Sequence, residues 1–261
     1  MNIDMLERLE IQGKMRVDIL QQRFFLHYQP QTDIKTGNIV GFEALLRWQD
    51  SNGKLISPAQ FIPVAEDSGQ ILPLGRMVLQ EACQQLAHWH KNGHTKLSMA
   101  INLSAVELRQ VDLKDAIQQA IESASIPPDK LELELTESVL LQDTGKSLEM
   151  LRLLKELGVT LSIDDFGTGY SSLSYLKRLN VDRLKIDRSF INDLPDDKDS
   201  IAITRAIIHM AHDLGITVVA EGVEKIEQAE ILGSMGCKIA QGYFYSEPKN
   251  AEAFAQLLAQ N

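Results

Sequence analysis

The sequence of 261 residues has little cysteine, few aromatic side chains and no excess of positive charge. Its only cysteines, Cys83 and Cys237, lie far apart and show no metal-ligand spacing, which predicts buried free thiols in a reducing compartment. Lysine and arginine number 26 against 36 aspartates and glutamates, giving a net charge of −10 that should repel DNA and RNA. An anionic ligand therefore needs metal ions or a local arginine cluster at its site.

The sequence also lacks an apolar run long enough for a membrane span and an opening segment typical of a secretory signal peptide. We therefore expect a cytoplasmic protein without membrane contact of its own. The sequence can still be one part of a longer protein. Hydrophobic residues make up 44% of the chain, enough for one large core, and this length is common for a single α/β barrel.

Hydrophobic periodicity predicts an opening helix followed by two strands. Met5, Leu6 and Leu9 fall at helical spacing within residues 1–20. The two apolar strands that follow are joined only by TDIKTGN, a turn containing Gly37 and Asn38. This joint is too short for a parallel crossover, so the first two strands should be antiparallel.

Beyond this hairpin the pattern alternates between strands and helices. Strands are expected over residues 24–31, 39–48, 97–104, 131–138, 159–165, 181–187, 216–223 and 238–244. Helices are expected over residues 111–124, 146–158, 171–179, 199–215, 225–236 and 251–260. This order favours an α/β fold, a (β/α)8 TIM-barrel variant with an antiparallel first strand. A doubly wound open sheet is the alternative.

Polar side chains lie in or just after most of these strands. They are Glu43, Asn102, Glu134, Glu137, Asp164, Asp165, Lys185, Asp187, Glu221 and Gln241. Taken singly, Glu43 can point outward, and Glu132 and Glu134 can be solvent-exposed. Asn102 can cap a helix, although Ser104 suits that role better. Together they favour a shared mouth, because a barrel gathers the carboxyl ends of its parallel strands on one face.

The stretch LSIDDFGTGYSSL places Asp164 and Asp165 side by side where a strand ends, and Ser171 can then open a helix. Adjacent carboxylates repel unless a cation lies between them. The oxygen ligands at the strand ends suit Mg²⁺ or Mn²⁺ rather than zinc, and they are more than one ion draws from protein. We therefore expect two ions about 3.5–4 Å apart. The six histidines are interpreted as surface or packing residues, since none ends a parallel strand.

Short motifs occur in order from about Phe25 to about Pro248. They are EALLRW, FIPVAEDSG, NLS, ELTES, DDFGTGYSSL, LKIDRSFI, AEGVE and QGYFYSEP. One such string is weak evidence, but the ordered series is specific. On these motifs the sequence resembles the EAL-domain family of cyclic di-GMP phosphodiesterases.

The resemblance implies a cyclic-guanylate-specific phosphodiesterase that hydrolyses cyclic di-GMP to linear 5′-pGpG, with two Mg²⁺ or Mn²⁺ ions activating a water. The implied metal ligands are Glu43, Asn102, Glu134, Asp164, Asp165 and Glu221, the last directly or through water. The implied catalytic residues are Lys185, which positions the water, with Glu221 and Glu43. The implied substrate-binding residues are Arg47 at a phosphate, Gln29 near the guanine, Gln241 and Pro248. Glu137 is implied to brace the loop after DDFG.

The domain assignment places the phosphodiesterase barrel at residues 23–261 and an N-terminal helix at residues 1–22. This helix either links the barrel to an upstream module or packs across its lower end. The resemblance also implies a homodimer through the region after Gly169, and a place as the C-terminal part of a membrane-anchored sensor. Because no implied ligand is missing, an active enzyme is favoured over a catalytically silent cyclic di-GMP receptor or an interaction module.

Overall fold

A long antiparallel hairpin opens the barrel, as the short joint predicts. Strand β1 (Phe24–Asp33) pairs with β2 (Ile39–Gln49) along most of its length, and Gln29 lies opposite Glu43. The turn is fixed by the carboxylate of Asp33, which accepts a hydrogen bond from the Thr36 backbone at 2.7 Å, and by Gly37 with φ +74°. The predicted turn and strand direction are confirmed.

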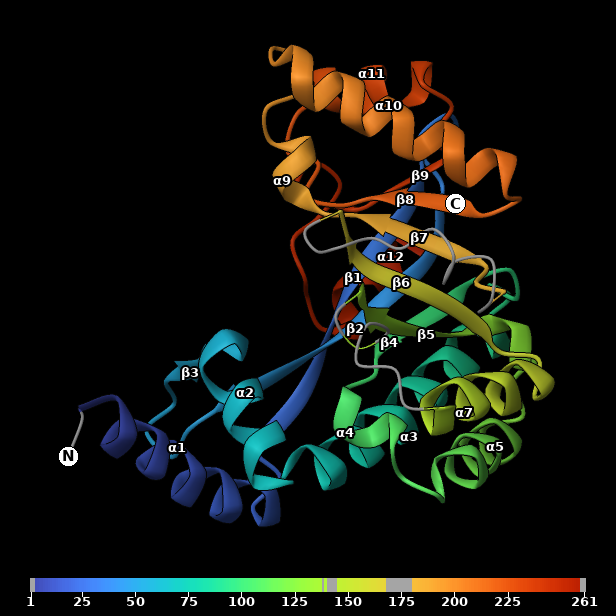
Figure 1. Cartoon of the computed structure of the whole chain (residues 1–261). Coiled ribbons are helices and arrows are strands. Elements are labelled where there is room, and N and C mark those ends of the chain that lie inside the picture. Colours follow the sequence, from blue (N-terminus) through green and yellow to red (C-terminus); the bar gives the residue numbers. More distant parts are fainter. Residues whose placement is uncertain (1–2, 138, 140–144, 168–179, 259–261) are drawn as a thin grey trace.

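The computed structural model describes residues 3–137, 139, 145–167 and 180–258. The parallel strands are β4 (Ser98–Asn102), β5 (Leu131–Thr136), β6 (Thr160–Phe166), β7 (Arg183–Ile186), β8 (Thr217–Ala220) and β9 (Ile239–Ala240). They follow β2 in chain order, and β1 closes the ring by pairing antiparallel with β9 (Figure 1). A short strand β3 (Leu55–Ile56) extends β2 outside the ring. The TIM-barrel variant is therefore confirmed, and the open sheet is wrong.

Most helices surround the ring in Figure 1, whereas the helix over residues 58–68 lies beside the opening helix at the far end of the hairpin. The helices that follow the hairpin are α2 (Pro58–Ser68), α3 (Ile71–Lys91), α4 (Ala105–Leu108), α5 (Leu113–Ala124), α7 (Gly145–Glu156), α9 (Arg188–Ile191), α10 (Lys198–Asp213), α11 (Ile226–Ser234) and α12 (Ala255–Leu258), with 3-10 turns η1 (Pro128–Lys130) and η2 (Ala251–Phe254). The helix expected over residues 171–179 lies outside the described residues. As predicted, Ser104 caps α4, in a capping box with Glu107.

The apolar core lies between the strands and the surrounding helices, not inside the ring. Leu131, Leu133 and Leu135 of β5 are fully buried in this outer core. The alternate residues Glu132 and Glu134 point the other way, into the lumen, and each is only 1% exposed. The alternative in which Glu132 and Glu134, taken singly, are exposed to solvent is therefore wrong, because the face that they share is the inside of a closed barrel. TIM-barrel interiors are ordinarily filled by branched apolar side chains, so this lumen is unusually polar.

A second apolar cluster anchors the opening helix α1 (Ile3–Leu20). Met15 of α1 is buried with Phe24, Trp48 and Phe61, and the indole of Trp48 donates a 2.9 Å hydrogen bond to Asp18. The apolar side chains Met5, Leu6 and Leu9 are about half exposed on the other part of this helix. Among the described residues, no helix combines the length and hydropathy needed to cross a bilayer.

Candidate active site

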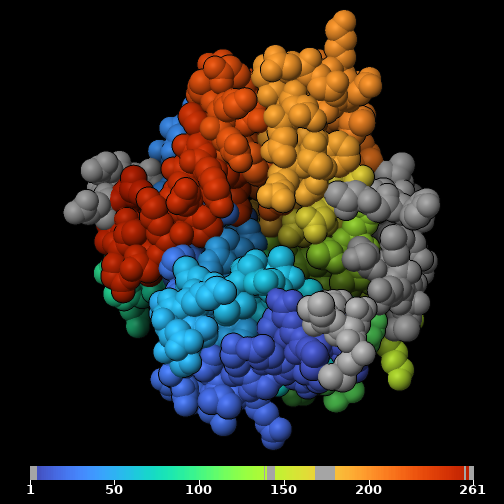
Figure 2. All heavy atoms as spheres, turned by 90° about the vertical axis from the view of Figure 1, so that its left-hand side faces the viewer, coloured from blue at the N-terminus to red at the C-terminus, as the bar shows by residue number. Residues whose placement is uncertain are grey.

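The predicted polar residues gather at the end of the barrel where the parallel strands finish. Figure 2 looks onto this end, and the surface there is hollowed between the cyan region of α2, the orange region around α9 and the red region that follows β9. We call the buried charged set in this region the mouth layer, defined as Glu43, Glu134, Asp164, Lys185 and Glu221.

Lys185 occupies the centre of the mouth layer. Its side chain is fully buried, because β7 lies between β6 and β8 in the closed ring. Its ammonium Nζ lies 2.7 Å from Glu134 Oε2 and 2.7 Å from Glu221 Oε1. Glu43 Oε2 follows at 3.3 Å and Asp164 Oδ1 at 3.5 Å. These four carboxylates therefore share one lysine, which is too little positive charge to balance them.

The two adjacent aspartates reach the same space through an irregularity in β6. In a regular strand Asp164 and Asp165 would point to opposite faces. The pairing of β6 with β7 shifts register between Ile163 and Phe166, and Asp165 has a left-handed backbone with φ +54°. Carboxylate oxygens of Asp164, Asp165 and Glu221 consequently all lie within 4.8 Å of one another. Strained backbone and bulges of this kind concentrate at functional sites.

Amide side chains hold Glu43 in place. Asn102, at the end of β4, donates from Nδ2 to Glu43 Oε1 at 2.7 Å. Gln241, just after β9, donates from Nε2 to Glu43 Oε2 at 2.6 Å and to Gln29 Oε1 at 3.0 Å. Gln29 in turn donates to the Ser246 carbonyl at 3.2 Å. Asn102 of β4 and Gln241 after β9 thus fix the Glu43 carboxylate by direct hydrogen bonds, and Gln29 of β1 contributes through Gln241.

Burial and crowded charge shift the pKa values of this site. Burial would lower the pKa of Lys185, but the carboxylates of Glu134, Glu221 and their neighbours raise it well above its ordinary value. Burial and the charge of Glu43 raise the pKa of Glu134 well above its usual range. Burial also raises the pKa of Glu221 to about 8, against the opposing effect of Lys185. Besides burial, these shifts share one cause, because the acids of the mouth layer outnumber the single basic group of Lys185.

The hairpin continues above the mouth layer and carries Arg47. Along β1 and β2, the pairs Gln29–Glu43 and Phe25–Arg47 lie opposite one another, so these side chains belong to one face. Arg47 is half-buried and donates to the Leu46 carbonyl at 3.0 Å. Burial lowers the pKa of Arg47, opposed by the charge of Glu43. Arg47, the predicted phosphate contact, thus lies on the same strand face as Glu43, one of the predicted metal ligands.

His27 was predicted to be a surface or packing residue, yet it shares the strand face of Gln29. Its ring lies 5.3 Å from that of Phe25, edge to face. Burial and the charge of Arg47 lower the pKa of His27. A hydrogen bond with the Pro248 backbone acts in the opposite direction and raises it. The contact with Phe25 agrees with the predicted packing role of His27.

Two further predicted residues lie next to the mouth layer. Glu137, directly after β5, accepts a hydrogen bond from the Gly167 backbone at 3.2 Å, so it contacts the last residue of DDFG. Asp187 does not join the cluster. Its carboxylate caps α9 instead, accepting from the Ser189 backbone at 3.0 Å.

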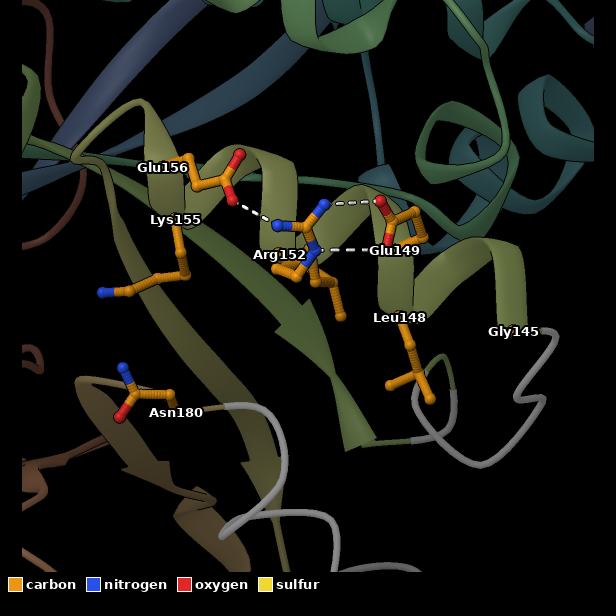
Figure 3. A pocket seen from close by; sticks show the side chains of 8 residues that line it. Gly145, Leu148, Glu149, Arg152, Lys155, Glu156 and Asn180 are labelled. Atoms are coloured by element: carbon orange, nitrogen blue, oxygen red, sulfur yellow. Dashed lines mark hydrogen bonds and ion pairs between the residues drawn. The ribbon is translucent and has the colours of Figure 1, made fainter.

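A groove on the side of the barrel offers a contrast to the mouth (Figure 3). It is lined by α7, where Arg152 is paired with Glu149 at 2.7 Å and with Glu156. Lys155 is paired with Asp182 at 2.6 Å. These ion pairs lie near the surface, where water screens the charges, so the groove lacks the buried excess of acid that marks the mouth.

Fold and site together define a TIM-barrel protein with an acidic, oxygen-rich mouth suited to hard divalent cations. Residues 12–248 match the model of the EAL domain, and the chain belongs to this family. It is 44% identical over 259 residues to the bifunctional diguanylate cyclase/cyclic di-GMP phosphodiesterase MucR of Pseudomonas aeruginosa, covering 99% of this chain and 37% of MucR. The cyclic di-GMP phosphodiesterase NbdA of the same organism is 41% identical over 252 residues, covering 97% of this chain and 32% of NbdA.

Solved structures agree with this assignment. The structure of the MucR phosphodiesterase in complex with c-di-GMP is similar with a TM-score of 0.90 and 43% identity, covering 94% of this chain and 99% of that chain. An EAL-domain protein from Listeria monocytogenes is similar with a TM-score of 0.80 and 32% identity, covering 95% of this chain and 98% of that chain. The chain spans about a third of the length of MucR and NbdA.

Proposed function

We propose that this chain is a metal-dependent phosphodiesterase that hydrolyses cyclic di-GMP to linear 5′-pGpG. The observation that carries the proposal is the excess of acid at the mouth: five carboxylates, those of the mouth layer and of Asp165, surround one ammonium group. Such crowding is unfavourable unless further cations bind. The phosphodiesterase names of MucR and NbdA, and the c-di-GMP bound to MucR, support the substrate class.

The donor set fits two Mg²⁺ or Mn²⁺ ions. All ligands would be oxygens, from Glu43, Asn102, Glu134, Asp164, Asp165 and Glu221. One buried acceptor, Glu134 Oε1, has no hydrogen-bond partner among the described residues and is free to bind a cation. The ions would supply Lewis-acid activation of water and neutralise charge on the phosphate.

The proposed roles of the protein groups follow from their positions. Lys185, held as an ammonium, would orient and polarise the attacking water as a hydrogen-bond donor. Arg47 would pair with a phosphate oxygen, while Gln29 and Pro248 would contact the substrate near its base. Gln241 would keep Glu43 oriented. Water attacks phosphorus in line, the P–O3′ bond breaks, and the proton ends on the departing 3′-oxygen, leaving a 5′-phosphate.

Product analysis tests the proposal. Incubation of the chain with cyclic di-GMP and Mg²⁺ or Mn²⁺ should yield pGpG by chromatography, and a chelator should stop the reaction. Tight binding without turnover would instead identify a receptor. Neither binding nor turnover would identify an interaction module.

A variant sharpens the ligand assignment. Glu43→Ala should abolish turnover and weaken Mn²⁺ binding in calorimetry, with the fold intact by circular dichroism. Glu252→Ala, at an exposed glutamate of η2, is the matched control and should behave as wild type. Normal hydrolysis by Glu43→Ala would show that the ligand assignment is wrong.

The remaining proposals concern context. Because MucR and NbdA are about three times longer, we propose that residues 1–22 connect the phosphodiesterase barrel of residues 23–261 to an upstream module of a cytoplasmic or membrane-anchored sensor. The exposed Met5, Leu6 and Leu9 of α1 support such a contact. The proposed homodimer contact after Gly169 lies outside the described residues, and light scattering of the isolated chain tests it.

A further inference from the structure

A second ion pair lies in the lumen one inward-facing position below the mouth layer. We call it the floor pair, defined as Glu132 and Arg183. Glu132 precedes Glu134 by two residues on β5, and Arg183 precedes Lys185 by two residues on β7, so each pair of side chains shares the inner face of its strand. Arg183 Nη1 lies 2.7 Å from Glu132 Oε2, and it also donates to Gln31 Oε1 at 3.2 Å.

Glu132 depends on this arginine for neutralisation. Its side chain is 1% exposed, and its second oxygen, Oε1, has no hydrogen-bond partner among the described residues. Burial raises the pKa of Glu132, and the charge of Arg183 is the largest opposing effect. Removing one partner of a buried ion pair is strongly destabilising, because the remaining charge stays uncompensated.

Lys185 is the next available cation for Glu132. It lies two residues from Arg183 on the same face of the same strand, and its charge already acts on Glu132. A long, flexible lysine side chain can change its partner more easily than the planar guanidinium of an arginine. Arg183 and Lys185 therefore lie at different levels of the lumen. Arg183 is paired with one acid in the floor pair, and Lys185 is paired with four acids in the mouth layer.

We propose that Arg183 is a positioning residue for the reaction: by neutralising Glu132, it keeps the Lys185 ammonium up in the mouth layer against Glu134 and Glu221. Without Arg183, Glu132 draws Lys185 down the lumen and away from Glu221, and the water-orienting donor leaves its place. The catalytic consequence rests on the proposed phosphodiesterase function, whereas the displacement of Lys185 does not.

Charge-removing variants test this relation. Arg183→Met should lower kcat about tenfold or more while KM changes less than about twofold, a difference of roughly 1.4 kcal/mol in the barrier. The double variant Arg183→Met/Glu132→Gln should return kcat to near the wild-type value, because the acid that attracts Lys185 is gone. Arg183→Lys, which keeps the charge, should also stay near wild type. Arg152→Met, which removes a surface arginine paired with two glutamates, is the matched control.

A structural readout separates this proposal from the proposed function. Rates are measured below the melting transition of each variant, so that lost folding is not counted as lost positioning. A crystal structure of Arg183→Met should place Lys185 Nζ within hydrogen-bond distance of Glu132 and beyond it from Glu221. If Arg183→Met does not fold, the position of Lys185 is determined instead in Arg183→Ala in the presence of Mn²⁺. Turnover is then compared between Arg183→Ala and the double variant.

Three results overturn the positioning role. They are an unchanged kcat in Arg183→Met, a double variant as impaired as the single one, or an unmoved Lys185 in the variant structure. If the wild-type chain hydrolyses no cyclic di-GMP, the proposed function fails, and the position of Lys185 in the variant alone decides the inference.

Discussion

The lumen contains two charged levels that differ in balance. In the floor pair, one guanidinium faces one carboxylate at 2.7 Å. In the mouth layer, one ammonium faces four carboxylates within 3.5 Å, and Asp165 lies beside them. Both levels use β5 and β7, and the mouth layer adds acids from β2, from β6 and from the residue after β8.

The comparison separates what the barrel needs from what the site needs. A single balanced pair is enough to fill a polar level of the lumen. Extra buried carboxylates raise the cost of folding through desolvation and repulsion. Local arrangements that oppose stability are expected mainly at functional sites. The acid excess of the mouth layer is therefore best explained by ligands that the layer binds.

Lys185→Met should produce the largest effect, because it removes the resident cation of the mouth layer. Uncompensated buried charge costs about 3–5 kcal/mol, so the variant should melt well below wild type in chelator. Hydrolysis of cyclic di-GMP should fall by about 10²–10⁴-fold. Mn²⁺ should raise the melting temperature of the variant more than that of wild type, since added cations replace the lost charge.

Lys155→Met is the control for this experiment. Lys155 is paired with Asp182 at 2.6 Å, but both side chains are partly exposed, and exposed pairs contribute about 0–1 kcal/mol. If Mn²⁺ raised the melting temperatures of Lys185→Met and wild type by the same amount, the mouth layer would not be short of positive charge.

Asp165 offers an intermediate test, because its backbone and its carboxylate can be changed separately. Its φ of +54° is costly for a residue with a side chain, on the order of 1 kcal/mol, and glycine avoids that cost. Asp165→Gly should therefore be about 1 kcal/mol more stable than wild type in chelator, and it should lose most hydrolysis. Asparagine, like aspartate, tolerates this left-handed backbone, so Asp165→Asn removes only the charge. Its free energy of unfolding should therefore lie between those of wild type and Asp165→Gly. A glycine variant that melts below wild type would show that Asp165 is not strained.

The sequence could predict which residues alternate, but not which face was inside. The period of two in LELELTE correctly places Glu132 and Glu134 on one face, but it left solvent exposure of that face as an alternative, because a polar face ordinarily meets water. Only closure of the ring, through β1 and β9, turns that face into a lumen. The partnership of Glu132 with Arg183 spans 51 residues of sequence, so no local pattern could indicate it.

The aspartate pair illustrates a second limit. The motif predicts a paired carboxylate site, but a regular strand would send Asp164 and Asp165 to opposite faces. The register shift that brings them together is a relation between β6 and β7 and depends on both strands. Residue types and strand ends were therefore predictable, whereas the backbone irregularity that unites them required the structure.

Glu137 should give the smallest effect, and it tests whether the charge imbalance is confined to the mouth layer. Within the described part of the chain it accepts one hydrogen bond, from the Gly167 backbone at 3.2 Å, and a bond of this kind contributes about 1 kcal/mol. Glu137→Ala should lower kcat by about fivefold, and Glu137→Gln, whose amide oxygen still accepts, should lower it less. Mn²⁺ affinity, measured by calorimetry, should be unchanged in both variants, because Glu137 is not among the acids around Lys185. If Mn²⁺ affinity fell as much as turnover, Glu137 would belong with the acids that bind the cations. The distinction between Glu137 and the acids of the mouth layer would then be wrong.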